Sequence, residues 1–243
     1  MKTIRLIPAL FLALASPSLA AELLWENFDS SPTGTVSALP GWTRSPWYPT
    51  HTGRVVNINY SHSPSNILEL QWSSIGSSAA YTNFSVTYTT AQHPVIRFSA
   101  KLLAANTNTF FRIGLRNSNT TNFLAFQSSN GYGVVGFNTR TSVYVPLVNN
   151  RLVDLSVLYN RSNGQIRLDY DYLTRLPWTN SDVYPTIHTQ FNQFGVIRHH
   201  IPTNPTGSFL VDDVSVETFP PHVWAWWRCS PDAARFIDQL GTF

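Results

Sequence analysis

The chain has 243 residues, of which 43 % are hydrophobic and only 12 % are charged. Charged residues make up about a quarter of an average soluble protein, so this composition excludes a charge-driven disordered chain and a coiled coil. The formal net charge is +3, and no run of Lys or Arg concentrates it. Because nucleic-acid binders normally carry a concentrated basic patch, we expect no nucleic-acid partner.

Residues 1–20 have the pattern of a secretory signal peptide. Lys2 and Arg5 form a positive start, and a short apolar stretch runs from Leu6 to Ala15. Ser18-Leu19-Ala20 then offers the small residues that signal peptidases read. The apolar stretch is short for a bilayer and no second one of spanning length follows, so we expect no membrane span in a secreted, cell-surface or periplasmic protein. The alternative is an uncleaved membrane anchor.

From residue 22 to 218, apolar and polar residues alternate with a period of two, as in the half-buried strands of antiparallel sheets. The pattern is clearest in residues 95–102 and 111–116. Asn-Gly pairs predict hairpin turns inside 122–137 and 152–172. Further strands are expected at residues 23–28, 54–60, 66–72, 80–88, 142–147, 193–199 and 208–217.

The many short predicted strands indicate an all-β fold. No amphipathic helix is predicted before residue 230, which excludes βαβ architectures. We expect residues 21–219 to form a sandwich of two antiparallel sheets. Residues 38–53 and 173–191 are predicted to be long loops, and loops of that length are often functional. Residues 220–243 are expected to form an aromatic tail outside the sandwich, with a candidate short helix near its end.

Three stretches resemble the concanavalin A-like (laminin G-like) jelly-roll superfamily of secreted lectin, carbohydrate-binding and glycanase domains. Glu26 to Asp29, followed by Leu39-Pro40-Gly41-Trp42, is similar to the first strand and first turn of such modules. Arg151 to Leu168 is similar to their central hairpin, and Phe209 to Val216 to their closing strand. The resemblance implies a jelly-roll sandwich and a glycan ligand, whereas the activity must be argued from the site.

Aromatic residues among the prolines of the two predicted loops are the candidate ligand-binding residues: Trp47, Tyr48, Trp178 and Tyr184. Flat rings stack on the apolar C–H faces of sugars, and rigid amphipathic rings give contact area at a low entropy cost. We therefore expect a lectin-like module that binds a polysaccharide or glycan and needs no cofactor. The alternative is that these rings pack beneath the loops. The oligomeric state is left open.

The resemblance also implies a structural Ca²⁺ site at the closing strand. In similar jelly rolls an Asp of that strand binds the ion together with ligands from the first strand, which here gives Asp212, Asp213, Glu26 and Asp29. Ca²⁺ takes about six to eight oxygen ligands, more than the sequence identifies. The alternative is a carboxylate that accepts backbone hydrogen bonds at a strand end.

A polysaccharide-degrading enzyme on the same fold is the first functional alternative. Asp169 and Asp171 lie two residues apart and are weak candidates for the carboxyl pair of a glycoside hydrolase. The segment from Arg112 to Arg116 is similar to the Arg-x-Glu-Leu-Arg strand of jelly-roll alginate lyases, and Thr186-Ile187-His188 to their Gln-Ile-His segment. In such a lyase Arg neutralises the uronate and His serves as base. The Glu and the Gln are missing here, so non-catalytic binding is preferred.

By parity, the polar sides of the predicted strands are mixed in charge. They carry Arg97, Lys101, Arg112, Arg116, Arg167 and Arg198 against Asp154, Asp169 and Asp171. If these strands share one sheet, its face would suit an acidic polysaccharide, because Arg matches the geometry of carboxylate and sulfate. The alternative is a solvated face with charges paired across strands. A third functional alternative is an adhesive or structural surface module whose aromatic tail docks onto another protein.

Overall fold

The computed structural model describes residues 20–36, 39–44, 53–60, 63–71, 77–104, 109–119, 123–129, 131–137, 144–148, 151–180, 190–199 and 207–221. The expected signal peptide up to residue 19, the residues Trp47, Tyr48, Tyr184 and His188, and the tail beyond residue 221 lie outside these ranges. Among the described residues, no helix has the length and apolar character needed to cross a membrane.

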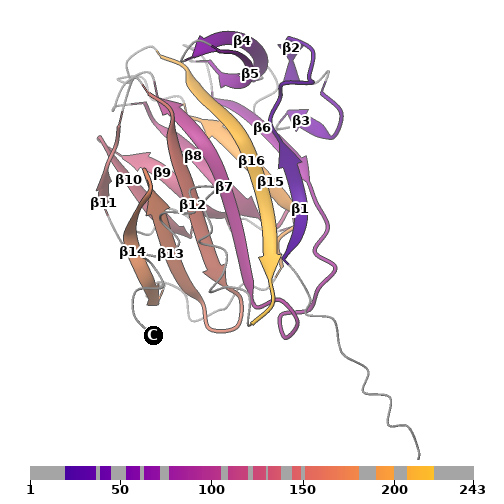
Figure 1. The fold of residues 1–243 in the computed structure, drawn as a ribbon, viewed down its shortest axis with the longest axis vertical. Coiled ribbons are helices and arrows are strands. Elements are labelled where there is room, and N and C mark those ends of the chain that lie inside the picture. Colours follow the sequence, from indigo (N-terminus) through magenta and orange to yellow (C-terminus); the bar gives the residue numbers. More distant parts are fainter. Residues whose placement is uncertain are drawn as a thin grey trace, which may run out of the picture.

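The described strands form two antiparallel sheets that pack face to face (Figure 1). Sheet A contains β1 (Ala21–Glu26), β2 (Gly34–Thr35), β4 (Arg54–Tyr60), β5 (Ser63–Leu70), β7 (Val95–Ala104), β12 (Val153–Asn160), β13 (Gln165–Tyr170), β14 (Leu173–Asn180) and β16 (Phe209–Phe219). Eight of its nine strands follow the order β14-β13-β12-β7-β16-β5-β4-β2, and the ninth, β1, pairs with β16 off this path.

Sheet B contains β3 (Trp42–Arg44), β6 (Ser78–Asn83), β8 (Phe111–Arg116), β9 (Phe123–Ser129), β10 (Tyr132–Phe137), β11 (Tyr144–Pro146) and β15 (Gln193–Arg198). Its seven strands follow the order β11-β10-β9-β8-β15-β6-β3. Neighbouring strands are therefore often far apart in the sequence, as expected when chain segments alternate between two layers.

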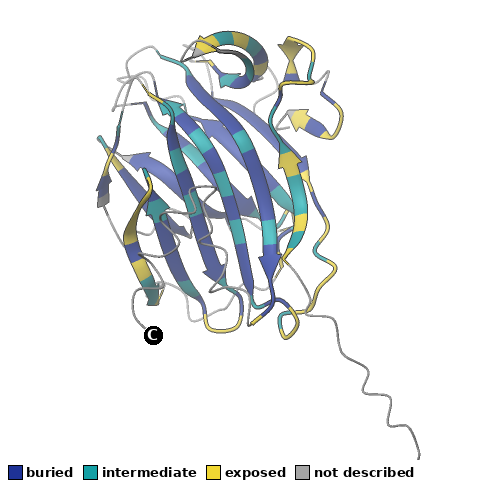
Figure 2. Cartoon of the chain, in the orientation of Figure 1, coloured by how far each residue is buried: buried dark blue, intermediate teal, exposed yellow. Residues whose placement is uncertain are grey.

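The core lies between the sheets and follows the predicted alternation. Phe111 of β8 stacks on Phe209 of β16 with ring centroids 3.9 Å apart, and Phe98 of β7 meets Phe194 of β15 edge-on at 6.1 Å. All four rings are fully buried. Each such ring stabilises the fold by about 1.5–3 kcal/mol through burial. Figure 2 shows that burial is densest in the central strands, while the edge strands β1 and β14 are largely exposed or half-buried.

The predicted all-β sandwich and both predicted hairpins are confirmed. β9 pairs with β10 around Gly131, and β12 pairs with β13 around Gly164. The two glycines have φ values of 85° and 76°, a backbone conformation that glycine adopts at little cost. The Asn-Gly signals therefore located the turns correctly.

Two expectations about the predicted loops were wrong. Residues 173–180 form the edge strand β14 rather than a loop, so Trp178 is a strand residue. Within the other predicted loop, Trp42 begins β3 and is buried against Phe28, with ring centroids 5.5 Å apart. Pro177 and an exposed, non-alternating pattern concealed β14, because an edge strand needs ladder hydrogen bonds on one side only.

The condition for a single Arg-bearing face, that these strands share one sheet, is not met, because the strands belong to two different sheets. Arg97, Lys101 and Arg167 lie on sheet A, where each pairs with a carboxylate. Arg112 and Arg116 lie on sheet B, on the side away from the core. The remaining one, Arg198, is only 1 % exposed and donates to the backbone oxygens of Gly207 and His199.

Candidate functional site

Trp178 lies near the end of β14, on the outer face of sheet A. One side of its side chain packs against a small buried cluster formed by Val95, Leu158 and Phe219. These three residues alternate with core residues on their strands, so they point away from the core. The indole is therefore half-buried and held in place by three strands.

The other surroundings of Trp178 form a cleft of about 510 Å³, called here the Trp178 cleft. Its volume lies within the range of about 300–1,000 Å³ that is usual for small-ligand sites. Polar side chains from the β12–β13 turn and the neighbouring segment line it beside the ring: Asn160, Ser162, Asn163, Gln165 and Thr90. The amide groups both donate and accept hydrogen bonds, so the cleft offers the hydrogen-bonding partners that hydroxyl groups need.

The turn at the cleft has its own hydrogen bonds, which fix the amides. The Asn160 side-chain oxygen accepts from the Ser162 backbone N–H at 2.9 Å. The Asn163 oxygen accepts from the Gln165 N–H at 3.0 Å, and the Asn163 amide nitrogen donates to Gln165 Oε1 at 3.1 Å. Side-chain amides that bond locally in this way are typical of tight turns.

Arg161 connects this turn by hydrogen bonds to the segment between β6 and β7, residues 84–94. Its side chain is only 3 % exposed, and Nη2 donates to the backbone oxygens of His93, Tyr88 (3.4 Å) and Thr89 (3.5 Å). Its backbone N–H donates to the oxygen of Pro94 at 2.6 Å. Burial lowers the pKa of the Arg161 guanidinium below its ordinary value.

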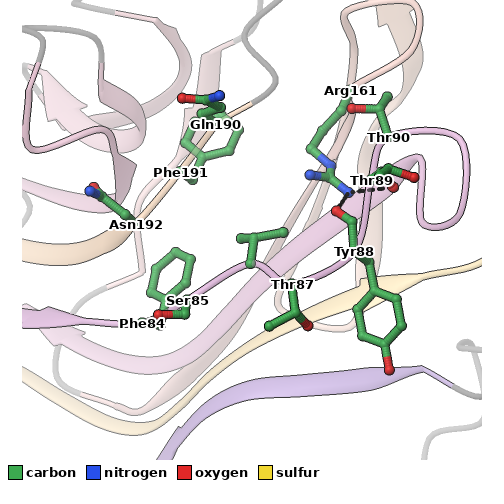
Figure 3. A pocket seen from close by; sticks show the side chains of 11 residues that line it. Phe84, Ser85, Thr87, Tyr88, Thr89, Thr90, Arg161, Gln190, Phe191 and Asn192 are labelled. Atoms are coloured by element: carbon green, nitrogen blue, oxygen red, sulfur yellow. Dashed lines mark hydrogen bonds between the residues drawn. The ribbon is translucent and has the colours of Figure 1, made fainter.

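A second cleft, of about 500 Å³, is lined by the same segment and shares Thr90 with the first. We call it the Arg161 cleft. Figure 3 shows Gln190 and Asn192 on one side of it, and Arg161 with Thr89 on the other. Among the described residues that line the two clefts there is no Asp or Glu, so the lining is suited to uncharged polar ligands and lacks the carboxyl pair of a hydrolase.

The weak hydrolase candidates lie elsewhere on sheet A and are held in ion pairs. Asp169 accepts hydrogen bonds from Arg167 Nη2 at 2.9 Å and from Thr174 at 2.6 Å. Asp171 lies in the turn after β13, with a φ of 55°, and accepts two hydrogen bonds from Arg151. The Arg151 hydrogen bonds lower the pKa of Asp171, which opposes a role as general acid.

Two of the lyase candidates lie on the outer face of sheet B. The Arg112 guanidinium lies over the Phe123 ring at 5.7 Å, and the Arg116 guanidinium over the Tyr81 ring at 5.1 Å. The third candidate, His188, lies outside the described residues, so the proposed lyase set stays a prediction.

Only two of the four candidate calcium ligands converge. Ser65 Oγ donates to Asp29 at 3.0 Å and lies 3.4 Å from Asp212. Glu26 instead accepts the backbone N–H of Phe28, and Asp213 pairs with Lys101. Burial raises the pKa of Asp212 to about 6, and the negative charges of Asp213 and Asp29 contribute to the shift.

The described residues contain no group of three or more His, Cys, Asp and Glu arranged to hold a metal ion. Two converging carboxylates and a hydroxyl supply about half of the oxygens that Ca²⁺ takes. These donors are fewer than a calcium ion takes, and the calcium site stays a prediction.

The sequence pointed to Trp178 but not to the residues around it. Asn160, Asn163 and Gln165 were recognised only as part of a turn. They meet Trp178 because β13 and β14 pair, with Gln165 opposite Asn180 and Ile166 opposite Thr179. The amide side chains on both sides of the Asn-Gly turn were the sequence signal for this site. Because β14 was not predicted as a strand, the sequence did not show that these amides lie beside Trp178.

No protein-family model matches the chain, and no curated protein matches it. Solved structures do match. A carbohydrate esterase from the Shiga toxin-encoding bacteriophage phi24B has a TM-score of 0.55 at 14 % identity, covering 82 % of this chain and 99 % of that chain. The CBM2 module of the evolved Dit of Lactobacillus casei BL23 phage J-1 has a TM-score of 0.54 at 13 % identity, covering 83 % and 97 %.

A sialidase has a TM-score of 0.54 at 11 % identity. The match covers 82 % of this chain and spans 18 % of the sialidase. At identities this low the likeness concerns the fold alone. The chain has the concanavalin A-like jelly-roll fold, which it shares with carbohydrate-binding modules and glycan-active enzymes.

Proposed function

We propose that this protein is a non-catalytic glycan-binding module that holds its ligand in the Trp178 cleft. The observation that carries the proposal is a half-buried indole beside five amide and hydroxyl side chains, in a cleft whose described lining has no carboxylate. The apolar C–H face of a sugar ring would lie on the indole. Its hydroxyl groups would exchange hydrogen bonds with Asn160, Asn163 and Gln165.

Rigidity of the cleft supports the proposal. Trp178 packs on three strands, and Arg161 ties the amide-bearing turn to the neighbouring segment. A site that is already formed loses little conformational freedom on binding, so more of the contact energy is kept as affinity. The structural neighbours include a carbohydrate esterase and a carbohydrate-binding module, which agrees with a glycan ligand.

The test is a glycan array that compares the wild type with Trp178→Ala and with Trp25→Ala as control. Trp25 is an exposed tryptophan of β1, 54 % exposed, and it lines neither cleft. A stacked aromatic ring contributes about 0.5–1.5 kcal/mol, so Trp178→Ala should weaken binding by about twofold to tenfold. Equal binding by wild type and Trp178→Ala on every glycan that is recognised would contradict the proposal.

The non-catalytic part of the proposal is tested separately. Incubation with a panel of polysaccharides should release no new reducing ends and produce no unsaturated uronate absorbance. New reducing ends without unsaturated uronate absorbance would favour the alternative of a glycoside hydrolase. Unsaturated uronate absorbance would favour a polysaccharide lyase, for which Arg112 and Arg116 are the candidates.

We also propose that the protein is exported, because residues 1–20 have the charge and hydropathy pattern of a signal peptide. Expression of the full chain should yield a mature protein that starts at Ala21, detectable by mass spectrometry. A mass that retains Met1 would contradict this.

A further inference from the structure

The two sheets differ in where their charges lie. None of the seven strands of sheet B contains Asp or Glu. Every Asp and Glu in the described ranges lies on a strand of sheet A or on a turn next to one. On sheet A these carboxylates neutralise neighbouring cations in five ion pairs: Arg54–Glu69, Arg97–Glu217, Lys101–Asp213, Arg151–Asp171 and Arg167–Asp169.

A row of small residues crosses the outer face of sheet B. Gly195 of β15 is opposite Gly114 of β8, Gly114 is opposite Ala125 of β9, and Ala125 is opposite Gly136 of β10. Because strands lie about 4.8 Å apart, the row runs for about 14 Å perpendicular to them. Side chains no larger than a methyl group leave the sheet surface low along this line, so larger side chains beside the row can lie flat across it.

Arg112 and Arg116 of β8 stand on the two sides of this row. Arg116 lies over Tyr81, and Arg112 lies over Phe123 and donates to Gln127 Oε1 at 3.1 Å. The two rings are only 4 % and 5 % exposed, while both arginines are half-buried. The guanidinium groups are thus positioned by stacking on aromatic rings, with an amide as a further contact for Arg112.

His199 lies next to this face and interacts with its arginines. It follows β15 directly, and its ring lies 4.9 Å from that of Phe110. Burial lowers the pKa of His199 to about 4, and the positive charges of Arg112 and Arg198 lower it further. At neutral pH the imidazole is therefore uncharged, and among the described side chains Arg112 and Arg116 provide positive charge on this face.

We propose that the outer face of sheet B is a second binding site, separate from the Trp178 cleft, for a linear anionic glycan that carries carboxylate or sulfate groups. Guanidinium forks match the geometry of both groups. Arg112 and Arg116 are four residues apart on one strand, so their Cα atoms are about 13 Å apart. Each guanidinium offers its own contact to an anionic group of the same chain.

The arrangement favours a glycan over a nucleic acid. Single-stranded nucleic acids bind by stacking their bases on aromatic side chains. On this face Tyr81 and Phe123 are buried beneath the guanidinium groups, so the rings are covered where a base would stack. Anionic groups, by contrast, contact the guanidinium edges while the rings stay covered.

The experiment measures binding of the full chain to polygalacturonate, dextran sulfate, uncharged dextran and single-stranded oligo(dT) at low and high salt. Wild type should bind at least one of the two anionic glycans, bind dextran more weakly, and lose affinity with salt. The two anionic probes decide between carboxylate and sulfate. Tighter binding to oligo(dT) than to both anionic glycans, or no binding to either glycan at low salt, would overturn the proposal.

The variants are Arg116→Gln and Arg112→Gln, with Arg175→Gln as the matched control for the loss of one positive charge. Arg175 is an exposed residue of β14 on sheet A. A charge-assisted hydrogen bond contributes enough that each sheet B variant should weaken binding about tenfold, with little change for the control. Equal weakening by all three would overturn the proposal, because it would reflect net charge alone.

Two further readouts keep this test separate from the Trp178 cleft. Arg116→Lys keeps the positive charge and can still cover Tyr81, so this variant should fold even if Arg116→Gln does not. It should bind the anionic glycan with intermediate strength, because the ammonium group lacks the paired N–H donors of the guanidinium. Trp178→Ala should bind the anionic glycan as the wild type does. Loss of anionic binding in Trp178→Ala with an intact fold would show that no second site exists.

Discussion

The guanidinium of Arg161 donates a hydrogen bond to the backbone oxygen of His93, and this contact joins the tip of the β12–β13 hairpin to the segment that precedes β7. The His93 ring in turn stacks on Tyr88 at 3.9 Å, and its Nδ1 lies 2.9 Å from Thr218 Oγ1 of β16. Hairpin, segment and last strand are therefore linked through two buried polar side chains. Arg161 lines the Arg161 cleft, and its sequence neighbours Asn160 and Ser162 line the Trp178 cleft.

Arg161→Met should destabilise the fold, because it keeps most of the side-chain volume but leaves buried backbone oxygens without their donor. We expect the free energy of unfolding to fall by about 2–4 kcal/mol. Urea unfolding followed by tryptophan fluorescence measures the change. The control Arg175→Met, at an exposed position, should change stability by less than about 0.5 kcal/mol. An equal loss in both variants would contradict the assigned role.

Asp212 should make the fold less stable as the pH rises. Its folded pKa of about 6 is above the ordinary value of 3.8, so the folded chain binds more protons between these values. The contribution of Asp212 to the free energy of unfolding is fully present at low pH, and it is lost as the pH rises through about 6. Asp212→Asn should therefore remove a cost at pH 7.5 of at most about 3 kcal/mol, measured by urea unfolding at several pH values. A pH dependence identical to that of the wild type would contradict the raised pKa.

His199 should act in the opposite direction. Its folded pKa of about 4 is below the ordinary value of 6.5, so the unfolded chain binds more protons between these values. The contribution of His199 to the free energy of unfolding should be fully present above pH 6.5. It should be lost as the pH falls toward 4. His199→Leu should reduce that loss, with a maximal difference of about 3 kcal/mol at low pH. Chemical shifts of the imidazole followed by NMR titration give an independent check.

Gly195→Ala should disturb sheet B. A Cβ at this position would lie 2.6 Å from the Tyr81 ring, which is itself covered by Arg116. The ring would have to move, and overpacking of this kind costs about 1–3 kcal/mol. We expect a lower melting temperature together with weaker binding to anionic glycans and unchanged binding in the Trp178 cleft. Unchanged stability would indicate that the Tyr81 ring does not occupy this position.

The sequence by itself determined the class of fold. The alternation of apolar and polar residues in segments such as Val95–Ala104 can bury only one side of a strand, and Asn-Gly pairs bend the chain back at Gly131 and Gly164. These signals are local, because they depend on side chains within one strand or turn. The same local signals failed at β14, where an exposed edge strand with Pro177 looks like a loop.

The tertiary structure alone decided which residues share a surface. Arg97 and Arg112 have the same place in the alternation of their strands, yet one pairs with Glu217 on sheet A and the other lies over Phe123 on sheet B. Likewise the turn amides face Trp178 only because β14 pairs with β13. Strand order and register arise from contacts between segments far apart in the chain, and no periodicity within one segment carries that information.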